Sequence, residues 1–321
     1  MSFRTTVAAA LAVLAVGAAA PAHAWPTQPV RLVVPFTPGT GIDLIARQLA
    51  ARLPERLGQP VLVDNRPGAS GNLGTEAVAR AQPDGHTLLV TVNTFVMNRS
   101  LYRKVPYEPT RDFAPITLAA WGSLLLTANP QAGAQTVPEA LAAARAQPGT
   151  VPYGSPGVGT PHHLAMALLE AASGTDFLHV PYTGTAGAVT DLIGGRTHYM
   201  FLPVHVALPH ARSGKLRALA IGSPQRAPAL PEVPTLGELG LGEVDVEMWY
   251  GVLAPRGTPP AVVARLNQEV RAALSTDDAR ASFATQGMQP AFSTPEEFGR
   301  LIERDQARWA RVVARARISA D

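Results

Sequence analysis

The sequence predicts an α/β fold of two lobes, and three observations support this prediction. Between residues 30 and 92 the order strand, helix, strand, helix, strand is typical of a largely parallel sheet with helices on its faces. A similar alternation returns between residues 151 and 202. The apolar run Trp249–Ala254 then adds one more strand, so the chain is expected to leave the first unit and later return to it. Two such crossings make a hinge between the units.

Apolar periodicity and turn residues predict the elements of the first unit. Ile45, Leu49 and Leu53 recur every four residues and share one face of a helix. The expected elements are strand Val30–Pro35, helix Ile42–Leu57, strand Val61–Val63, loop Asn65–Asn72, helix Leu73–Ala81, turn Pro83–Gly85 and strand Thr87–Val92.

Capping residues predict where the later helices begin. Thr136 with Glu139, and Thr294 with Glu297, have the spacing of a capping box. Thr160-Pro161 and Thr258-Pro259 each offer an N-cap followed by proline. The expected elements are strands Phe113–Leu118 and Leu124–Ala128, separated by Trp121-Gly122; a helix to Ala146; strand Val151–Gly154; a helix ending near Gly174; strand Phe177–Pro181; helix Ala188–Ile193; strands Tyr199–Leu202, Leu216–Ile221 and Trp249–Ala254; a helix to Leu274; and a last helix to about Ala316.

These elements predict a discontinuous first lobe. We expect residues 25–120 and 248–321 in lobe 1, residues 121–247 in lobe 2, and a hinge near residues 117–123 and 247–250.

The start of the chain predicts export. A basic start at Arg4, an apolar run from Val7 to about Ala20, and Ala22-His23-Ala24 are typical of a secretory signal peptide cleaved after Ala24. An uncleaved membrane anchor is the alternative, but the run is shorter than the roughly 20 residues that a bilayer span needs.

Composition excludes several classes of function. Hydrophobic content of 46% and charged content of 16% are typical of a globular chain. A net charge of +3, without a Lys/Arg stripe, argues against nucleic-acid binding. The sequence contains no cysteine, so the chain has no disulfide, thiol nucleophile or thiolate metal site.

The most informative stretch is Val30–Leu57, where a Pro/Gly-rich loop joins a strand to a helix. Free backbone N–H groups and the positive end of the helix dipole make such a helix start an anion site. Related arrangements recur at Val151–Leu169 and Phe177–Ile193, which predicts several helix starts around an anionic small molecule. Asp43, in the first helical turn, either complements the dipole or accepts a hydrogen bond from the ligand.

Two motifs resemble cofactor or metal sites, but each lacks a feature that such a site requires. Gly39-Thr40-Gly41 lacks the third glycine of a dinucleotide-binding loop, because Leu44 stands there. His162 and His163 are adjacent on a helix and point about 100° apart, so they do not readily share a metal ion. His163 is expected to be structural, with ligand contact as the alternative. No cofactor and no metal are expected.

The sequence also argues against catalysis. Ser155 lacks the G-x-S-x-G context of a nucleophile elbow, so we expect it to donate a hydrogen bond. No nucleophile, base and orienting group come together, and the protein is not expected to be an enzyme.

Several segments in a fixed order carry a family resemblance. They are Pro35–Asp43, Asn65–Asn72, Pro83–Leu89, Leu101-Tyr102, Asp112–Pro115, Gly159–Leu164, His179–Gly184, Ala229–Thr235 and Leu253–Pro259. In these segments the chain resembles the substrate-binding proteins of tripartite tricarboxylate transporters, the Bug family.

This resemblance implies a type II-like periplasmic binding protein fold, a Venus flytrap in which each lobe is a mixed sheet flanked by helices. Two proline-containing loops would pinch a carboxylate through backbone groups and bound water. The implied ligand-binding residues are Phe36, Pro38, Gly39, Thr40, Gly41, Ile42 and Asp43 in the first loop; Asn93; Ser155, Pro156, Gly157, Val158, Gly159, Thr160, Pro161 and His162 in the second; Thr183, Gly184, Thr185 and Ala186 in a third wall; and Leu202.

Two of these residues depart from the family pattern. Thr40 replaces the second glycine of the usual Pro-Gly-Gly, and Leu202 stands where many relatives carry Asp. Leu202 favours a ligand without an amine. A bulky side chain at Gly39 or Gly159 is expected to abolish binding and leave the fold intact.

The resemblance implies a monomeric periplasmic receptor that closes on a small carboxylate and delivers it to integral-membrane permease subunits. The ligand stays open among dicarboxylates, aromatic carboxylates, amino acids and nicotinate-like compounds. Two alternatives are a receptor that reports occupancy to a signalling partner and a secreted serine hydrolase that uses Ser155.

Overall fold

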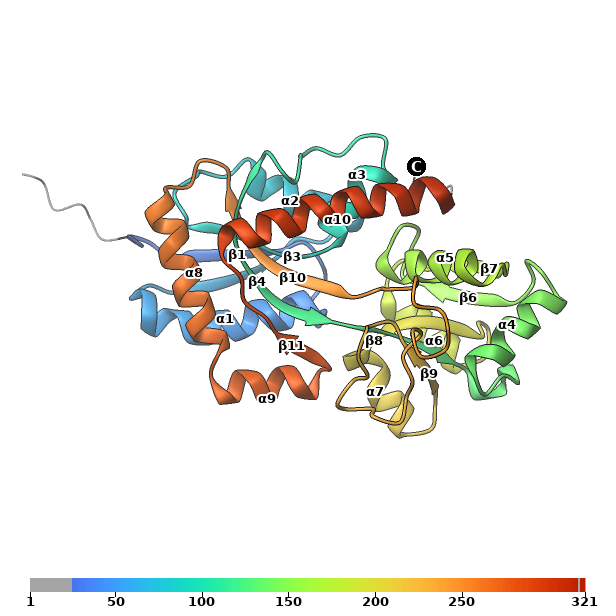
Figure 1. Cartoon of the computed structure of the whole chain (residues 1–321). Coiled ribbons are helices and arrows are strands. Elements are labelled where there is room, and N and C mark those ends of the chain that lie inside the picture. Colours follow the sequence, from blue (N-terminus) through green and yellow to red (C-terminus); the bar gives the residue numbers. More distant parts are fainter. Residues whose placement is uncertain (1–24, 317, 321) are drawn as a thin grey trace, which may run out of the picture.

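The computed structural model describes residues 25–316 and 318–320, which form two mixed β-sheets, each flanked by helices (Figure 1). The predicted signal peptide, residues 1–24, lies outside the described residues. Within those residues, no helix is long and apolar enough to cross a membrane. The predicted α/β class with two mixed sheets is confirmed.

The first sheet has the strand order β11-β4-β10-β3-β1-β2. Strand β1 pairs in parallel with β2 and β3, whereas β10 and β11 are antiparallel to their neighbours. Its elements are β1 (Val30–Val34), α1 (Gly41–Leu57), β2 (Val61–Asn65), α2 (Asn72–Ala79), β3 (Thr87–Val92), α3 (Thr94–Leu101), β4 (Phe113–Gly122), β10 (Met248–Pro255), α8 (Pro260–Leu274), α9 (Asp277–Thr285), β11 (Met288–Pro290) and α10 (Pro295–Ala316), with the 3₁₀ turn η1 (Ala69–Gly71).

The second sheet has the order β7-β6-β8-β5-β9. Strand β6 is parallel to β7 and β8, and β5 is antiparallel to β8 and β9. Its elements are β5 (Leu124–Ala128), the 3₁₀ turn η2 (Pro130–Ala132), α4 (Val137–Ala146), β6 (Pro152–Ser155), α5 (Pro161–Ser173), β7 (Leu178–Pro181), α6 (Thr185–Ile193), β8 (Tyr199–Pro203), α7 (Val204–Arg212) and β9 (Arg217–Ile221).

The central strands are continuous apolar runs because both of their faces are covered. Every residue of β10 is buried, as is every residue of β5, and β3 is buried after its first residue. The loops of the predicted site follow the strands β1, β6 and β7.

The chain crosses between the sheets twice. Strand β4 continues through Trp121 and Gly122, and Ser123 alone separates it from β5. The expected break at Trp121-Gly122 was therefore wrong: Gly122 pairs with Met248 on one side and Met288 on the other, which keeps it in the sheet. The second crossing is the long segment of residues 222–247.

Several elements were not predicted. Helix α3 is buried on most sides, so it lacks the alternation of apolar and polar faces that marks a surface helix. Helix α7 contains Pro209, which sequence rules count against a helix interior. Helix α9 and the short strand β11 were also missed.

Helix α10 links the two halves of the molecule. It runs across the helices of the first half and its C-terminal part reaches α5 of the second half (Figure 1). Beyond it, the backbone N–H of Ala320 donates to the carbonyl of Leu101.

Candidate ligand-binding site

The β1–α1 loop ends in a helix start without a side-chain cap. Thr40 occupies the N-cap position, but its hydroxyl donates backwards to the carbonyl of Thr37 at 3.1 Å and caps no N–H group. The N–H of Leu44 makes the first helical hydrogen bond, to Thr40. The N–H groups of Gly41, Ile42 and Asp43 precede that bond and have no acceptor within the helix.

The β6–α5 loop repeats this arrangement. Thr160 is the N-cap of α5, and its hydroxyl donates to the carbonyl of Gly157 at 2.8 Å. The first helical bond runs from the N–H of Leu164 to Thr160. Because Pro161 has no N–H, the groups left at this helix start are those of His162 and His163.

Threonine behaves differently at helix starts elsewhere in the protein. The hydroxyls of Thr136, Thr276 and Thr294 accept the N–H groups of Glu139, Ala279 and Glu297, at 3.4, 3.3 and 3.2 Å. The predicted capping box at Thr294 is confirmed by the return bond from its N–H to Glu297. The threonine hydroxyl therefore accepts the free N–H groups at three helix starts. At α1 and α5 it leaves these N–H groups open to an anion.

One predicted cap was wrong. Helix α8 begins at Pro260 with Pro259 as its N-cap, while the hydroxyl of Thr258 donates to Pro255 at 2.8 Å. The predicted capping box at Thr136 is also altered. The carboxylate of Glu139 accepts the N–H of Gln135, whereas a capping box would use the N–H of Thr136.

Asp43 holds the first loop in shape. Its buried carboxylate accepts the N–H of Gly39 at 2.9 Å, Nε of Arg47 at 2.8 Å and Nδ2 of Asn65 at 3.0 Å. Burial alone would raise the pKa of Asp43, but these hydrogen bonds outweigh it and hold the pKa below its ordinary value. A carboxylate with three donors is already occupied, so its role here is to position the loop.

Ser155 and the histidines behind it order the second loop. Ser155 is fully buried, and its Oγ lies 2.6 Å from Nε2 of His179 and 3.2 Å from the N–H of Gly157. His163 accepts the N–H of Gly159 at 3.0 Å and stacks on His179, with ring centroids 3.9 Å apart. His163 is thus structural, as expected. The serine–histidine contact spans 24 residues of sequence, and no local motif marks it.

These bonds show which loop donors are already used. The N–H groups of Gly39, Gly157 and Gly159 all donate within their own loops. The first turns of α1 and α5 follow these loops, and their N–H groups have no acceptor within the helix.

The remaining predicted residues lie in different surroundings. Residues 183–186 lie at or near the surface at the start of α6, whose N-cap, Gly184, has no side chain to cap it. Asn93 is buried and donates to the carbonyl of Glu247 at 3.2 Å, while its Oδ1 has no partner. Leu202 is fully buried in the core of the second half, against residues such as Leu125 and Val189. It presents no surface to a ligand, so the expected apolar wall does not lie at Leu202.

Contacts between the halves border the two helix starts. A Cβ on Gly159 would lie 2.7 Å from Cδ1 of Leu101 in α3, and one on Gly287 would lie 2.2 Å from Cγ1 of Val204 in α7. The β6–α5 loop therefore rests directly on the first half of the molecule.

Sequence reasoning missed two residues at the first helix start. A Cβ on Gly41 would lie 2.8 Å from both the hydroxyl of Tyr250 and Cε of Met288. Tyr250 belongs to the fully buried strand β10, where an aromatic residue indicates core packing and nothing more. Its phenol nevertheless reaches the place where the N–H groups of α1 are free.

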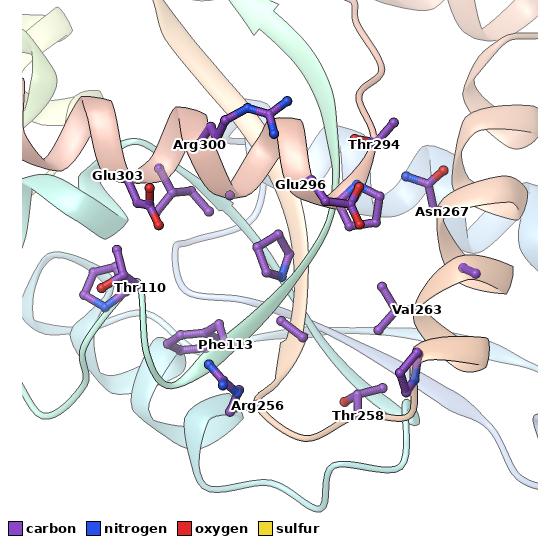
Figure 2. A pocket seen from close by; sticks show the side chains of 18 residues that line it. Thr110, Phe113, Arg256, Thr258, Val263, Asn267, Thr294, Glu296, Arg300 and Glu303 are labelled. Atoms are coloured by element: carbon purple, nitrogen blue, oxygen red, sulfur yellow. The ribbon is translucent and has the colours of Figure 1, made fainter.

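A broad groove of about 1020 Å³ lies elsewhere, between the start of β4, α8 and α10 (Figure 2). It is lined by charged side chains such as Arg256, Glu296, Arg300 and Glu303, and by none of the predicted ligand residues. The start of α10, which borders the groove, is closed by the Thr294–Glu297 capping box. Among the described residues, no cluster of three His, Cys, Asp or Glu could hold a metal ion.

Two mixed sheets flanked by helices, with two crossings of the chain between them, are the architecture of two-lobed periplasmic binding proteins. The chain belongs to the tripartite tricarboxylate transporter receptor family: the family model "Tripartite tricarboxylate transporter family receptor" matches residues 45–318. This is a family of solute-binding receptors.

Three known proteins illustrate the similarity. BugT of Bordetella pertussis is 37% identical over 301 residues, which cover 92% of each chain. The structure of R. palustris Rpa4515 with adipate has a TM-score of 0.86 at 35% identity and covers 92% of this chain and 99% of that one. MatC from Rhodopseudomonas palustris with bound malate has a TM-score of 0.81 at 34% identity, covering 90% of this chain and 99% of that one.

Proposed function

We propose that this protein is a periplasmic solute receptor that holds a small carboxylate between the starts of α1 and α5 and delivers it to membrane permease subunits. The observation that carries the proposal is that Thr40 and Thr160 turn their hydroxyls away from the helix starts that they occupy. Family membership and the carboxylates bound by two relatives support it.

The ligand is held without a dedicated cation. Arg47, the nearest arginine on α1, pairs with Asp43 at 2.8 Å, so its charge is engaged. Hydrogen bonds to a charged group contribute roughly 1.5–3 kcal/mol each. Four or five of them, less the cost of association and closure, leave about −8 kcal/mol, which corresponds to a dissociation constant near 1 μM.

Capture occurs by hinge closure of a monomer. In this proposal lobe 1 comprises residues 25–120 and 248–321, lobe 2 comprises residues 121–247, and the hinge lies near residues 117–123 and 247–250. The single residue Ser123 between β4 and β5 supports a crossing at that point, although Trp121 and Gly122 still pair within the first sheet. Export by a signal peptide cleaved after Ala24 completes the proposal.

A thermal-shift screen of the mature chain, freed of co-purified ligand, tests this function. The panel is adipate, malate, succinate, benzoate, nicotinate and aspartate, each beside the amide in which every carboxylate is replaced. A ligand that binds only the native state raises the melting temperature by mass action. A shift with an acid and none with its amide supports the receptor, and no shift with any acid contradicts it.

One observation favours a second function, serine hydrolysis, because Ser155 Oγ and His179 Nε2 lie 2.6 Å apart. The geometry argues against hydrolysis, because Ser155 is fully buried. Its Oγ accepts the N–H of Gly157 and lies within hydrogen-bond distance of the Gly157 carbonyl. We therefore propose that the protein is not an enzyme. Steady turnover of p-nitrophenyl acetate that is lost in Ser155→Ala would contradict this.

A further inference from the structure

Helix α10 carries a row of arginines along one side. The row consists of Arg300, Arg304, Arg308, Arg311 and Arg315, and we call it the arginine stripe. At about 100° of rotation per residue, the five positions fall within about 80° of the helix circumference and extend over about 22 Å. All of them are exposed except Arg308, which is half-buried. The expectation of a chain without a Lys/Arg stripe therefore needs correction at α10.

The stability of the helix does not account for the stripe. In the part of the chain that the structure describes, Arg308 alone among the five forms an ion pair, with Asp245 at 3.4 Å. Three pairs of arginines lie four residues apart, and like charges at this spacing destabilise a helix. The helix dipole favours cations only within the last turn, which holds Arg315. The stripe thus opposes helix stability, which indicates a use for it outside the helix.

The surface that the stripe forms is of one sign. From Arg304 to the end of α10 the helix contains a single carboxylate, that of Asp305. Asp305 is buried and accepts Nε1 of Trp249 at 2.7 Å, so it does not neutralise the exposed side. A complementary partner therefore carries carboxylates at intervals of about one helical turn, and arginine can bind a carboxylate through two parallel hydrogen bonds.

Small side chains beside the stripe favour a protein segment as the partner. Ala307, Ala310 and Ala314 are exposed and form a row next to the arginines. The distance between packed helices depends on the side chains at their contact, so alanines permit a close approach. Ala307 and Ala310 also line a cavity of about 410 Å³ that extends to Arg99 of α3. The side chains of a second helix would fill such a recess, whereas a lipid surface has no need of it.

The stripe lies where a partner can meet both halves of the molecule. Helix α10 runs along the outside of the first half and reaches α5 of the second (Figure 1). Arg308 joins the stripe to Asp245, near the end of the second crossing of the chain. A segment bound along α10 would therefore lie beside that crossing.

We propose that the arginine stripe is the surface on which this receptor docks to its permease, by binding an acidic helix whose carboxylates recur about once per turn. This rests on the proposed function, because delivery of the ligand to a permease requires a docking surface. Charge complementarity of this kind speeds the encounter of two proteins and fixes the register in which they bind.

Uptake by cells tests the stripe. The bacterium that encodes the protein, with its own gene deleted, receives either the wild type or the triple variant Arg304→Gln, Arg311→Gln, Arg315→Gln. Uptake is measured with the radiolabelled acid of the panel that gives the largest thermal shift. We expect the glutamine variant to slow uptake by about tenfold or more, because arginines at an interface often carry much of its binding energy. Its dissociation constant for the acid should equal wild type, and its melting temperature should be unchanged or raised.

Two matched variants isolate the charge of the stripe. The corresponding triple lysine variant keeps the charge and should keep most of the uptake. A second triple glutamine variant changes the net charge by the same amount at exposed arginines elsewhere and should transport like wild type. Its three positions are Arg212 in α7, Arg217 in β9 and Arg271 in α8.

The outcomes distinguish the stripe from the receptor function. Wild-type uptake by the stripe variant, or an equal loss in the second glutamine variant, would overturn the docking surface and leave the receptor function standing. Flotation of the wild type with phosphatidylglycerol vesicles, lost in the stripe variant, would assign the stripe to lipid head groups and overturn the acidic helix. No binding of any acid in the thermal-shift screen would overturn the proposed function and the docking surface together.

Discussion

The hydroxyl of Thr160 donates to the carbonyl of Gly157, 2.8 Å away, and so the residue at the N-cap of α5 does not cap its helix. Thr40 makes the equivalent bond to Thr37 at the start of α1. In each case the hydroxyl tightens the preceding loop while the first helical turn keeps its donors for another acceptor. We propose that this hydrogen bond keeps each of the two helix starts available to an anion.

An acidic N-cap should close that site. In Thr160→Asp the new carboxylate accepts the N–H groups of the first turn of α5 and takes the position of the ligand. We expect binding of the best acid from the screen to fall at least tenfold in calorimetry, with the melting temperature unchanged or raised. Thr136→Asp is the matched control, because Thr136 already caps α4, and its affinity should equal wild type. Full affinity in Thr160→Asp would contradict an N-terminal anion site on α5.

Gly39 and Gly159 should respond differently to alanine, although both have positive φ, +83° and +73°. No atom lies within 4 Å of a Cβ at Gly39, so Gly39→Ala carries only the backbone strain of about 1–2 kcal/mol. At Gly159 the methyl also meets Leu101, so we expect a larger loss of stability in urea unfolding. The expectation that bulk at either glycine leaves the fold intact thus needs correction at Gly159. Equal losses of unfolding free energy in the two variants would show that Leu101 in α3 moves aside for the new methyl group.

Asp43→Asn should loosen the first loop. An amide cannot accept from Gly39, Arg47 and Asn65 in the same way, and we expect a loss of about 1–3 kcal/mol at pH 7. The folded pKa of Asp43 lies below its ordinary value of 3.8, so its contribution is present above that value and is lost as the pH falls through the folded pKa.

Unfolding in urea at pH 7 and at pH 3 checks this. The difference in unfolding free energy between wild type and Asp43→Asn should be larger at pH 7 than at pH 3. A difference that does not change with pH would mean that the charge of Asp43 does not stabilise the loop.

Tyr250→Phe removes the hydroxyl that lies close to Gly41 at the start of α1. If the phenol donates to the bound acid, affinity should fall about threefold to tenfold while the melting temperature holds. Tyr107→Phe is the control, because Tyr107 donates to the carbonyl of Phe95 at 3.1 Å and its loss should lower stability and spare affinity. Unchanged affinity in Tyr250→Phe would remove Tyr250 from the site.

Local patterns predicted most of the fold but only part of the site. Apolar runs and capping residues located strands such as β10 and the box at Thr294, because these signals lie within a few residues of each other. Helix α3 was missed because burial on most of its sides removes the alternation of apolar and polar faces that marks a surface helix. The bond between Ser155 and His179, the approach of Tyr250 to Gly41, and the burial of Leu202 depend on how distant segments pack, and no spacing in the sequence encodes them.

The most direct test of the central claim is the backbone amide NMR spectrum of the deuterated mature chain, recorded with and without a saturating acid from the screen. We expect the largest amide shifts at Gly41, Ile42 and Asp43 in α1 and at His162 and His163 in α5, since their N–H groups receive the carboxylate. Largest shifts at Arg256 and Arg300, which line the groove of Figure 2, with those helix starts unmoved, would contradict it.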